Sequence, residues 1–142
     1  MLADHEEQSF IAALNKDTGK TVWKQGRDEK TSWTSPLVVQ HDGQTQIVVT
    51  GRNRTRAYNP KDGTVIWECG GQTENVIPTP VTGFDMVFCT SGFRGSTLQA
   101  IQLGKTGDLT GTDAIAWEVN AGTPYVPSPL LYGDQVYVNA VN

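Results

Sequence analysis

Two stretches of eleven residues, ALNKDTGKTVW from Ala13 to Trp23 and AYNPKDGTVIW from Ala57 to Trp67, have nearly the same sequence and lie 44 residues apart. Tryptophan and proline recur with similar spacing along the chain, at Trp23, Trp67 and Trp117 and at Pro36, Pro80 and Pro129. Repeats with a period of about 20–50 residues are typical of folds in which each repeat is one small unit that stacks on the next. This periodicity constrains the fold more than any other feature of the sequence.

The segments between the repeated residues are typical of short β-strands. Valine, isoleucine, threonine and aromatic residues form short runs that glycine and aspartate separate. The dipeptides Asp42-Gly43, Asp62-Gly63 and Gly133-Asp134 favour tight turns, because these residue types tolerate a positive φ. No window shows the apolar period of a helix. The sequence therefore predicts an all-β fold, in which four short antiparallel strands per repeat form one blade of a β-propeller.

The repeated small and aromatic residues predict contacts between neighbouring blades. An indole is large and flat, and burying one covers about 150–250 Å². A tryptophan on the outer strand of one blade can pack against small alanine and glycine surfaces of its neighbour. We therefore interpret the repeated tryptophans as structural rather than ligand-binding. The predicted docking set consists of Ala13, Gly19, Trp23, Ala57, Gly63, Trp67, Ala100 and Trp117.

This pattern resembles the docking motif of the pyrroloquinoline-quinone-like (PQQ-like) propeller repeat, Ala-x-Asp-x-x-Thr-Gly-Lys-x-x-Trp. The two clearest copies match it at Ala13, Thr18, Gly19, Lys20 and Trp23, and at Ala57, Gly63 and Trp67. Asparagine replaces the aspartate in both copies. In a third copy, Ala100 and Trp117 are seventeen residues apart rather than ten, which predicts an enlarged turn within QLGKTGDLTGTD. The family includes quinoprotein alcohol and glucose dehydrogenases, and also non-enzymatic scaffolds such as the lipoprotein of the bacterial outer-membrane assembly machinery.

The predicted strands add up to about three blades. The predicted units are a half blade at residues 9–24, full blades at 35–68 and 79–118, and a second half blade at 128–140. Members of the family commonly have seven or eight blades, so the chain departs from the pattern in length. Two explanations stay open. The sequence is a piece of a longer propeller, or the half blades of two or more copies pair and close a ring as a homo-oligomer.

The charge of the chain bears on its possible partners, and the positions of its cysteines bear on their oxidation state. The formal net charge of −4 argues against nucleic acid, because binding phosphates requires a basic field. The basic stretch GRNRTR, with Arg52, Arg54 and Arg56, is interpreted as a solvated strand edge or turn, with an anion site as the alternative. Cys69 and Cys89 each follow a strand-like run, which favours two buried free thiols over a disulfide.

The sequence leaves the compartment open. No apolar stretch approaches the roughly 20 residues that a membrane-spanning helix needs. Residues 1–10 lack the basic and then apolar order of a signal peptide, which predicts a chain that is not exported. The family resemblance, by contrast, implies a periplasmic or exported protein.

Several short motifs do not support a catalytic or metal site. The tripeptide GKT at Gly19 and at Gly104 lacks the earlier glycine of a phosphate-binding loop. Asp108 and Asp113 are interpreted as turn residues rather than calcium ligands, because calcium takes about six to eight oxygens. His41 lies just before a predicted hairpin turn and is expected to be exposed to solvent.

The resemblance also raises the question of a quinone cofactor. The family's dehydrogenases bind PQQ with calcium, use an aspartate base and carry a disulfide between adjacent cysteines. Cys69 and Cys89 are twenty residues apart, and no segment aligns with the calcium ligands or the base. We therefore predict no catalytic residue, no metal site and no cofactor, with PQQ and calcium kept as the alternative.

Three residues in predicted loops are candidates for binding a partner. Trp33 lies in KTSWTSP, Arg94 in SGFRGS and Tyr125 in GTPYVPSP, and Tyr, Trp and Arg are favoured in binding surfaces. Either these side chains line one face and bind a protein or a polymer such as a glycan, or Trp33 and Tyr125 pack under their own loops. The predicted function is a non-catalytic binding or scaffold module. The alternative is part of a periplasmic PQQ-dependent quinoprotein oxidoreductase.

Overall fold

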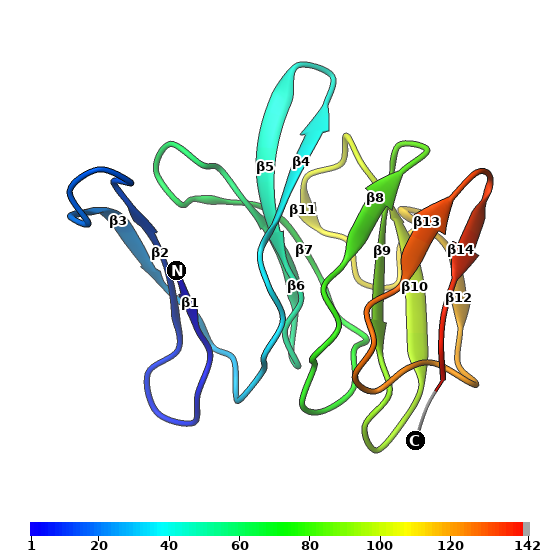
Figure 1. The fold of residues 1–142 in the computed structure, drawn as a ribbon. Helices are drawn as coiled ribbons and strands as arrows, with labels where there is room; N and C mark the ends of the chain where they lie inside the picture. Colours follow the sequence, from blue (N-terminus) through cyan, green and yellow to red (C-terminus); the bar gives the residue numbers. More distant parts are fainter. Residues whose placement is uncertain (141–142) are drawn as a thin grey trace.

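The computed structural model describes residues 1–140, and all helical or strand structure in that range is β-strand (Figure 1). The predicted all-β class is confirmed. The strands are β1 (Leu2–Ala3), β2 (Phe10–Leu14), β3 (Thr21–Gly26), β4 (Leu37–His41), β5 (Gln44–Val49), β6 (Thr55–Tyr58), β7 (Val65–Cys69), β8 (Val81–Gly83), β9 (Met86–Ser91), β10 (Thr97–Gln102), β11 (Gly107–Asp108), β12 (Ile115–Val119), β13 (Leu130–Tyr132) and β14 (Gln135–Tyr137).

The strands form four sheets that follow one another across the molecule (Figure 1). Their strand orders are β1-β2-β3, β11-β7-β6-β5-β4, β12-β10-β9-β8 and β13-β14. Neighbouring strands are antiparallel, except that β11 runs parallel to β7. Each of the two central sheets therefore contains four antiparallel strands that are connected in sequence order, and a shorter sheet lies on either side of this pair.

The predicted tight turns are present where local residue chemistry favours them. Asp42 and Gly43 join β4 to β5 with φ values of 47° and 74°, and Gly133 joins β13 to β14 with a φ of 59°. Both central residues of the first turn have a positive φ, which matches the twist of the strands that the turn connects.

Each repeated alanine is the cross-strand partner of the tryptophan that follows it. The pairs are Ala13 with Trp23, Ala57 with Trp67 and Ala100 with Trp117. In all three pairs of strands the register shifts directly after the alanine. The repeated letters thus correspond to one repeated piece of geometry, a small residue opposite a large flat one, followed by a bulge that increases the local twist.

Apolar side chains are buried between successive sheets. The largest cluster includes Val48 and Trp67 from one central sheet and Val87 and Cys89 from the other. Phe88 belongs to a separate cluster on the opposite side of β9. Because side chains on a strand alternate between its two faces, a central strand contributes to the core on both sides. This arrangement suits a stack of sheets and explains the absence of a simple polar and apolar alternation in β9.

The enlarged turn in the third repeat returns to the neighbouring sheet. Its β11 pairs in parallel with β7, with Gly107 opposite Trp67. Leu109 and Ala114 from the same segment join the apolar cluster around Trp67, whose side chain is fully buried. The seven extra residues therefore form part of a cover over the indole of the preceding repeat.

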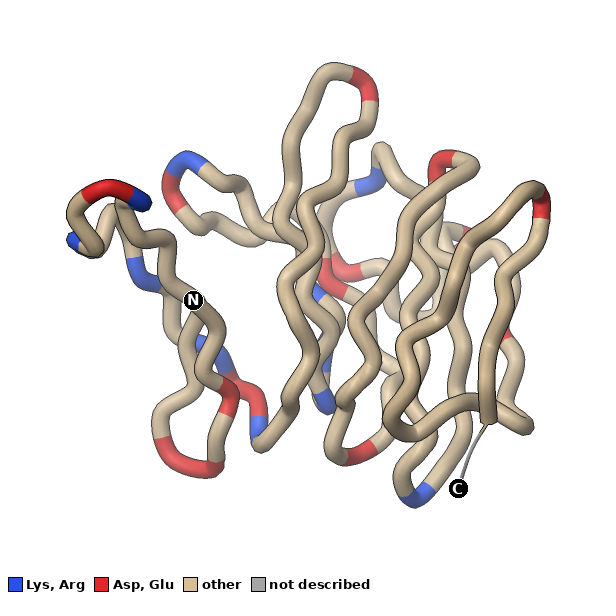
Figure 2. The backbone as a smooth tube through the Cα atoms, viewed as in Figure 1, with Lys and Arg blue, Asp and Glu red and all other residues tan. Residues whose placement is uncertain are grey.

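A buried ionic cluster joins the first sheet to the second. Arg27 donates to both carboxylate oxygens of Asp4, at 2.8 and 3.0 Å, and neither side chain is exposed. Glu29 accepts hydrogen bonds from the backbone N–H groups of Asn53 and Arg54. Burial raises the pKa of Glu29, against the opposing effect of these hydrogen bonds and of two arginines. Elsewhere in the described part of the chain, charged residues lie mainly in turns (Figure 2).

The interpretation of GRNRTR as a solvated edge or an anion site was wrong for Arg56. This residue is buried and pairs with Glu29 and Glu68, each at 2.9 Å. Arg52 pairs with Glu74 at 2.8 Å and Arg54 with Asp108 at 2.9 Å, so all three arginines of the stretch have carboxylate partners. Apart from Glu68 on the adjacent strand β7, these carboxylates come from distant segments, which is why the local sequence did not reveal them.

The expected solvent exposure of His41 was also wrong. Its side chain is only 14% exposed and lies between Asp42 and Asp85, at 3.4 and 3.3 Å. Asp85 belongs to the turn between β8 and β9, so the histidine connects the tips of two hairpins from neighbouring sheets.

Candidate binding surface

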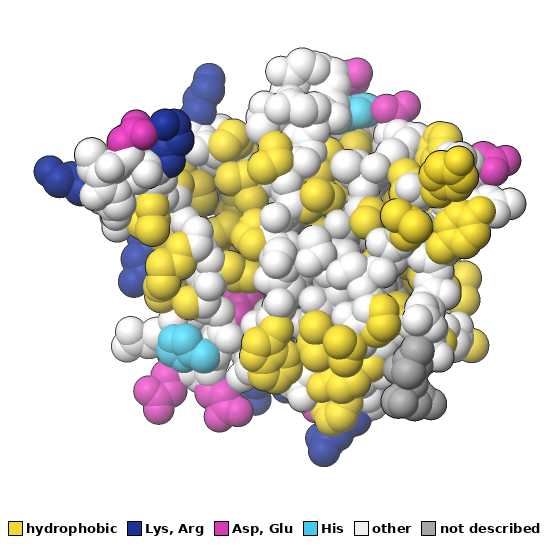
Figure 3. All heavy atoms as spheres, in the orientation of Figure 1, with side chains coloured by type: hydrophobic (Ala, Val, Ile, Leu, Met, Phe, Trp, Pro, Cys, Tyr) yellow, Lys and Arg dark blue, Asp and Glu magenta, His cyan; other side chains and the backbone are white. Residues whose placement is uncertain are grey.

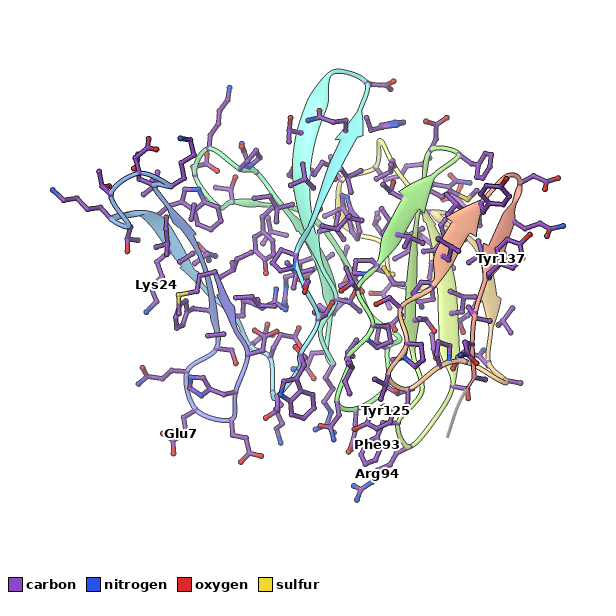
Figure 4. All side chains as sticks on the ribbon, viewed as in Figure 1. Glu7, Lys24, Phe93, Arg94, Tyr125 and Tyr137 are labelled. Atoms are coloured by element: carbon purple, nitrogen blue, oxygen red, sulfur yellow. The ribbon has the colours of Figure 1, made fainter. Side chains whose placement is uncertain are left out.

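The three predicted partner-binding residues lie in connections at the same end of the sheets. Trp33 lies between β3 and β4, Arg94 between β9 and β10, and Tyr125 between β12 and β13. Figure 4 shows Phe93, Arg94 and Tyr125 together at the lower end of the molecule. In the space-filling view, hydrophobic side chains gather along this lower edge next to a basic one (Figure 3). We call Trp33, Phe93, Arg94 and Tyr125 the aromatic loop surface.

Two aromatic rings and one guanidinium form the centre of this surface. The rings of Phe93 and Tyr125 are stacked, with centroids 5.0 Å apart and an interplanar angle of 28°. The guanidinium of Arg94 lies 5.3 Å from the centre of the Phe93 ring. Phe93 thus has an aromatic neighbour and a cationic neighbour, a combination that presents both apolar area and positive charge to solvent.

The backbone around the stacked rings is closely packed. A Cβ on Gly92 would lie 2.7 Å from the backbone of Thr123 and Pro124, so a side chain at this position would push the two loops apart. The hydroxyl of Thr123 donates to the carbonyl of Ser91 at 2.7 Å. Tyr125 is therefore positioned by a loop that is fixed against the end of β9.

Trp33 extends the surface toward the second sheet. Its backbone N–H donates to the carbonyl of Val76 at 2.7 Å, and its side chain is largely free, with 56% of the residue exposed. Glu74, two residues before Val76, forms an isolated bridge with Phe93. Trp33 and Phe93 are thus both attached to the segment 74–76. Trp33 does not pack under its own loop, whereas Tyr125 is half-buried.

Glu74 provides the charged centre of this surface. Its carboxylate lies 2.8 Å from Arg52 and 3.4 Å from Arg94, and the latter side chain is 71% exposed. The longer distance and greater exposure leave Arg94 free to exchange this partner for another acidic group. Phe93 lies in the same SGFRGS loop as the predicted residue Arg94, whereas no local pattern in the sequence indicated Glu74.

The three repeated tryptophans of the predicted docking set have different environments. Trp23 is half-buried, donates from its indole N–H to the carbonyl of Pro60 at 2.8 Å and lies directly over Gly63. Trp67 is fully buried and donates to the side-chain oxygen of Gln46 at 2.8 Å. Trp117 is 39% exposed.

Trp117 lines an apolar groove of about 680 Å³ on the last full sheet. Its ring lies 5.8 Å from that of Phe88 at a tilted angle. The other groove residues come from β9, β10, β12 and the final hairpin, and include Met86, Leu98, Val119, Val136 and Tyr137. Tyr137 appears on this side of the molecule in Figure 4.

Asp108, considered above as a calcium ligand, is already engaged by neighbouring protein groups. Within residues 1–140, no three His, Cys, Asp or Glu side chains are grouped so that they could hold a metal ion. Asp108 accepts hydrogen bonds from the hydroxyl and backbone N–H of Thr110 and pairs with Arg54, interactions that lower its pKa. Cys69 and Cys89 are separate buried thiols, as predicted.

Comparison with known proteins identifies a related family. A family model described as outer membrane protein assembly factor BamB matches residues 7–141. No curated protein matches the sequence. Among the residues that the structure describes, no helix is of the length and apolarity required for crossing a membrane.

Proposed function

The chain belongs to the PQQ-like repeat family whose model is described as outer membrane protein assembly factor BamB, and we propose that it is a non-catalytic binding or scaffold module. Its blades act as a rigid support, and its partner binds at the aromatic loop surface. The single observation that carries this proposal is the group formed by the exposed side chains of Trp33 and Arg94 and the half-buried, stacked rings of Phe93 and Tyr125.

The chemistry of the surface supports a protein as the first expected partner and a glycan as the second. Stacked rings and an exposed tryptophan offer apolar area at a small cost in side-chain entropy, and arginine adds directional hydrogen bonds. A protein with an acidic group could take the place of Glu74 beside Arg94, since the two are 3.4 Å apart. Sugar rings could instead stack on Trp33. The family description names an assembly factor, and assembly requires contact with other proteins.

The experiment compares the chain with a variant that carries Trp33→Ala, Arg94→Ala and Tyr125→Ala. We expect the variant to lose capture of the partner from a cell extract while its circular dichroism spectrum stays unchanged. A matched control carries Lys105→Ala and Tyr132→Ala, two exposed residues at the opposite end of the sheets, and should capture the partner normally.

A second arm separates the two partner classes. Digesting the extract with a protease before capture should abolish binding of a protein but leave binding of a glycan intact. Capture that survives the triple substitution would mean that the aromatic loop surface is not the binding site.

A further inference from the structure

A small polar cavity lies between the β4–β5 hairpin and the segment that leads into β11, and its volume is about 210 Å³. These two elements come from the two central sheets and lie at the end of the molecule opposite the aromatic loop surface (Figure 1). The lining residues that matter for its chemistry are His41, Asp42, Gln46, Ile66, Lys105 and Thr106.

The enlarged turn of the third repeat forms one wall of this cavity. In the first two repeats, residues 15–20 and 59–64 connect the two strands directly. In the third repeat the chain instead passes over the neighbouring sheet before it enters β12, and residues 104–106 of this path line the cavity. The extra residues therefore build a cavity wall that the shorter turns do not have.

Backbone and ring contacts hold the wall in place. The backbone N–H of Leu103 donates to the carbonyl of Asp85 at 2.8 Å. Gly104 packs on the imidazole of His41, because a Cβ at this glycine would lie only 3.1 Å from Nε2. The same imidazole lies 3.4 Å from Asp42 and 3.3 Å from Asp85. The cavity is thus bounded by groups that the fold already fixes.

Gln46 presents a buried donor without a partner to the cavity. The residue is only 3% exposed, and its Oε1 accepts a hydrogen bond from the indole N–H of Trp67 at 2.8 Å. This bond fixes the orientation of the amide, yet Nε2 has no acceptor within residues 1–140. Leaving a buried N–H unpaired is unfavourable, and such a group in a native structure calls for an unseen partner. Gln46 therefore indicates that the cavity holds a hydrogen-bond acceptor.

Two more unpaired donors lie at the outer part of the cavity. Lys105 and Thr106 are exposed, and their side chains form no ion pair or hydrogen bond within the described residues. Threonines in comparable turns are paired, since Thr64 donates to Asp62 at 2.7 Å and Thr110 donates to Asp108 at 2.6 Å. An amide, an ammonium and a hydroxyl thus line one cavity, and all three can donate to a ligand.

A neighbouring cavity of about 380 Å³ lacks this combination. It lies on the other side of the β4–β5 turn and includes Lys61 among its lining residues. All of its lining residues are exposed or half-buried, so no buried donor faces it. The buried amide of Gln46 distinguishes the smaller cavity, and Lys61 offers a matched control for Lys105.

We propose that the smaller cavity binds a small organic monocarboxylate. The carboxylate accepts hydrogen bonds from Nε2 of Gln46 and the hydroxyl of Thr106 and pairs with the ammonium of Lys105. Ile66 contacts the alkyl part of the ligand. The volume is below the usual range of about 300–1,000 Å³, which limits the ligand to a few heavy atoms. Asp42 places a negative charge near the positive charge of Lys105, so a doubly charged anion such as phosphate fits less well.

The first test titrates the isotope-labelled protein with sodium propionate at constant ionic strength and follows proton–nitrogen correlation NMR spectra. We expect saturable shifts in the side-chain amide signals of Gln46 and in the backbone signals of Lys105 and Thr106. Propionamide has the same shape but no charge, and it should bind at least about tenfold more weakly, as should inorganic phosphate. No saturable shift with propionate, or tighter binding of phosphate or propionamide, would overturn the proposal.

The second test uses variants that remove one donor at a time. Gln46→Glu keeps an oxygen that can accept from Trp67 but replaces the amide donors, and Lys105→Met removes the charge at an exposed position. Each should weaken propionate binding by roughly tenfold or more. Lys61→Met is the matched control and should bind propionate normally, with circular dichroism as the check on folding.

Lys105→Met decides the outcome even if Gln46→Glu fails to fold, because Lys105 lies on the surface. Propionate binding that is unchanged in Lys105→Met, or that falls equally in Lys61→Met, would show that the cavity is not the site. The aromatic loop surface has no part in this site. Its failure to capture a partner would therefore leave the propionate result unchanged, and the reverse also holds.

Discussion

Substituting Gly63 with alanine tests whether the repeated indoles stabilise the contact between neighbouring sheets. The new Cβ would lie 2.5 Å from Cε3 and 2.8 Å from Cζ3 of Trp23, so the indole would have to move. Gly63 also has a φ of +76°, a conformation that costs an alanine roughly 1–2 kcal/mol. The two effects must be separated before the contact can be assigned a free energy.

Gly43→Ala isolates the backbone effect, because Gly43 has nearly the same φ and open space around it. This control should lower the free energy of unfolding by about 1–2 kcal/mol. In Gly63→Ala, forcing the indole aside adds roughly 1–3 kcal/mol for overpacking. Part of this cost is the loss of the Trp23 hydrogen bond to Pro60, which contributes about 1 kcal/mol. The total expected loss is therefore about 2–5 kcal/mol.

Urea denaturation followed by far-ultraviolet circular dichroism measures these differences. A double-mutant cycle with Trp23→Ala provides the stringent check, because removing the indole should make Gly63→Ala no more costly than Gly43→Ala. Equal losses for Gly63→Ala and Gly43→Ala in the presence of Trp23 would refute the reasoning. The repeated tryptophan would then contribute little to the contact between sheets.

Two further predictions follow from buried groups. Asp4→Asn leaves Arg27 buried without its ionic partner and should lower the free energy of unfolding by about 3–5 kcal/mol. Arg54→Ala removes a partly exposed ion pair and should lower it by only about 1 kcal/mol or less. Urea denaturation measures both differences. Burial raises the pKa of Cys69 to about 11 and that of Cys89 to about 12, so neither thiol should react with a thiol reagent near neutral pH until the chain is unfolded. Both pKa values are higher in the folded chain than the unfolded value near 9. The stability that the neutral thiols contribute is therefore fully present below pH 9 and is lost as the pH rises toward 11–12. A urea midpoint that does not fall over this range would contradict the raised pKa values.

Local sequence was sufficient for most of the strands, though not for β1, and for many of the turns. A glycine beside an aspartate determines a tight turn through φ alone, and the turn at Asp42 and Gly43 needs no distant contact. The alternation of small and large residues across two adjacent strands likewise depends on nearby residues. This is why the spacing of Ala57 and Trp67 already indicated a hairpin, and why the two residues are opposite each other in the structure.

The features that the sequence did not reveal depend on partners far along the chain. Arg56 lies in a run that has the composition of a surface turn, yet its partner Glu29 is 27 residues away and belongs to a different part of the fold. His41 is covered by Asp85, which a different hairpin provides. The parallel pairing of β11 with β7 requires the two sheets to be packed first. Such contacts arise from the order in which sheets stack, and no local pattern specifies that order.

The docking contacts of the tryptophans involve different residues from those of the aromatic loop surface. Two docking contacts between sheets lie near the strand ends that carry the docking turns, where Gly63 meets Trp23 and where β11 runs beside Trp67. The loops that contain Trp33 and Phe93 lie at the other end of the sheets (Figure 1). They contribute little to the main apolar cluster, none of whose members belongs to them. The exposed side chains of Trp33 and Arg94 can therefore change to suit a partner while the stack of sheets keeps its geometry, which is the property that a binding scaffold requires.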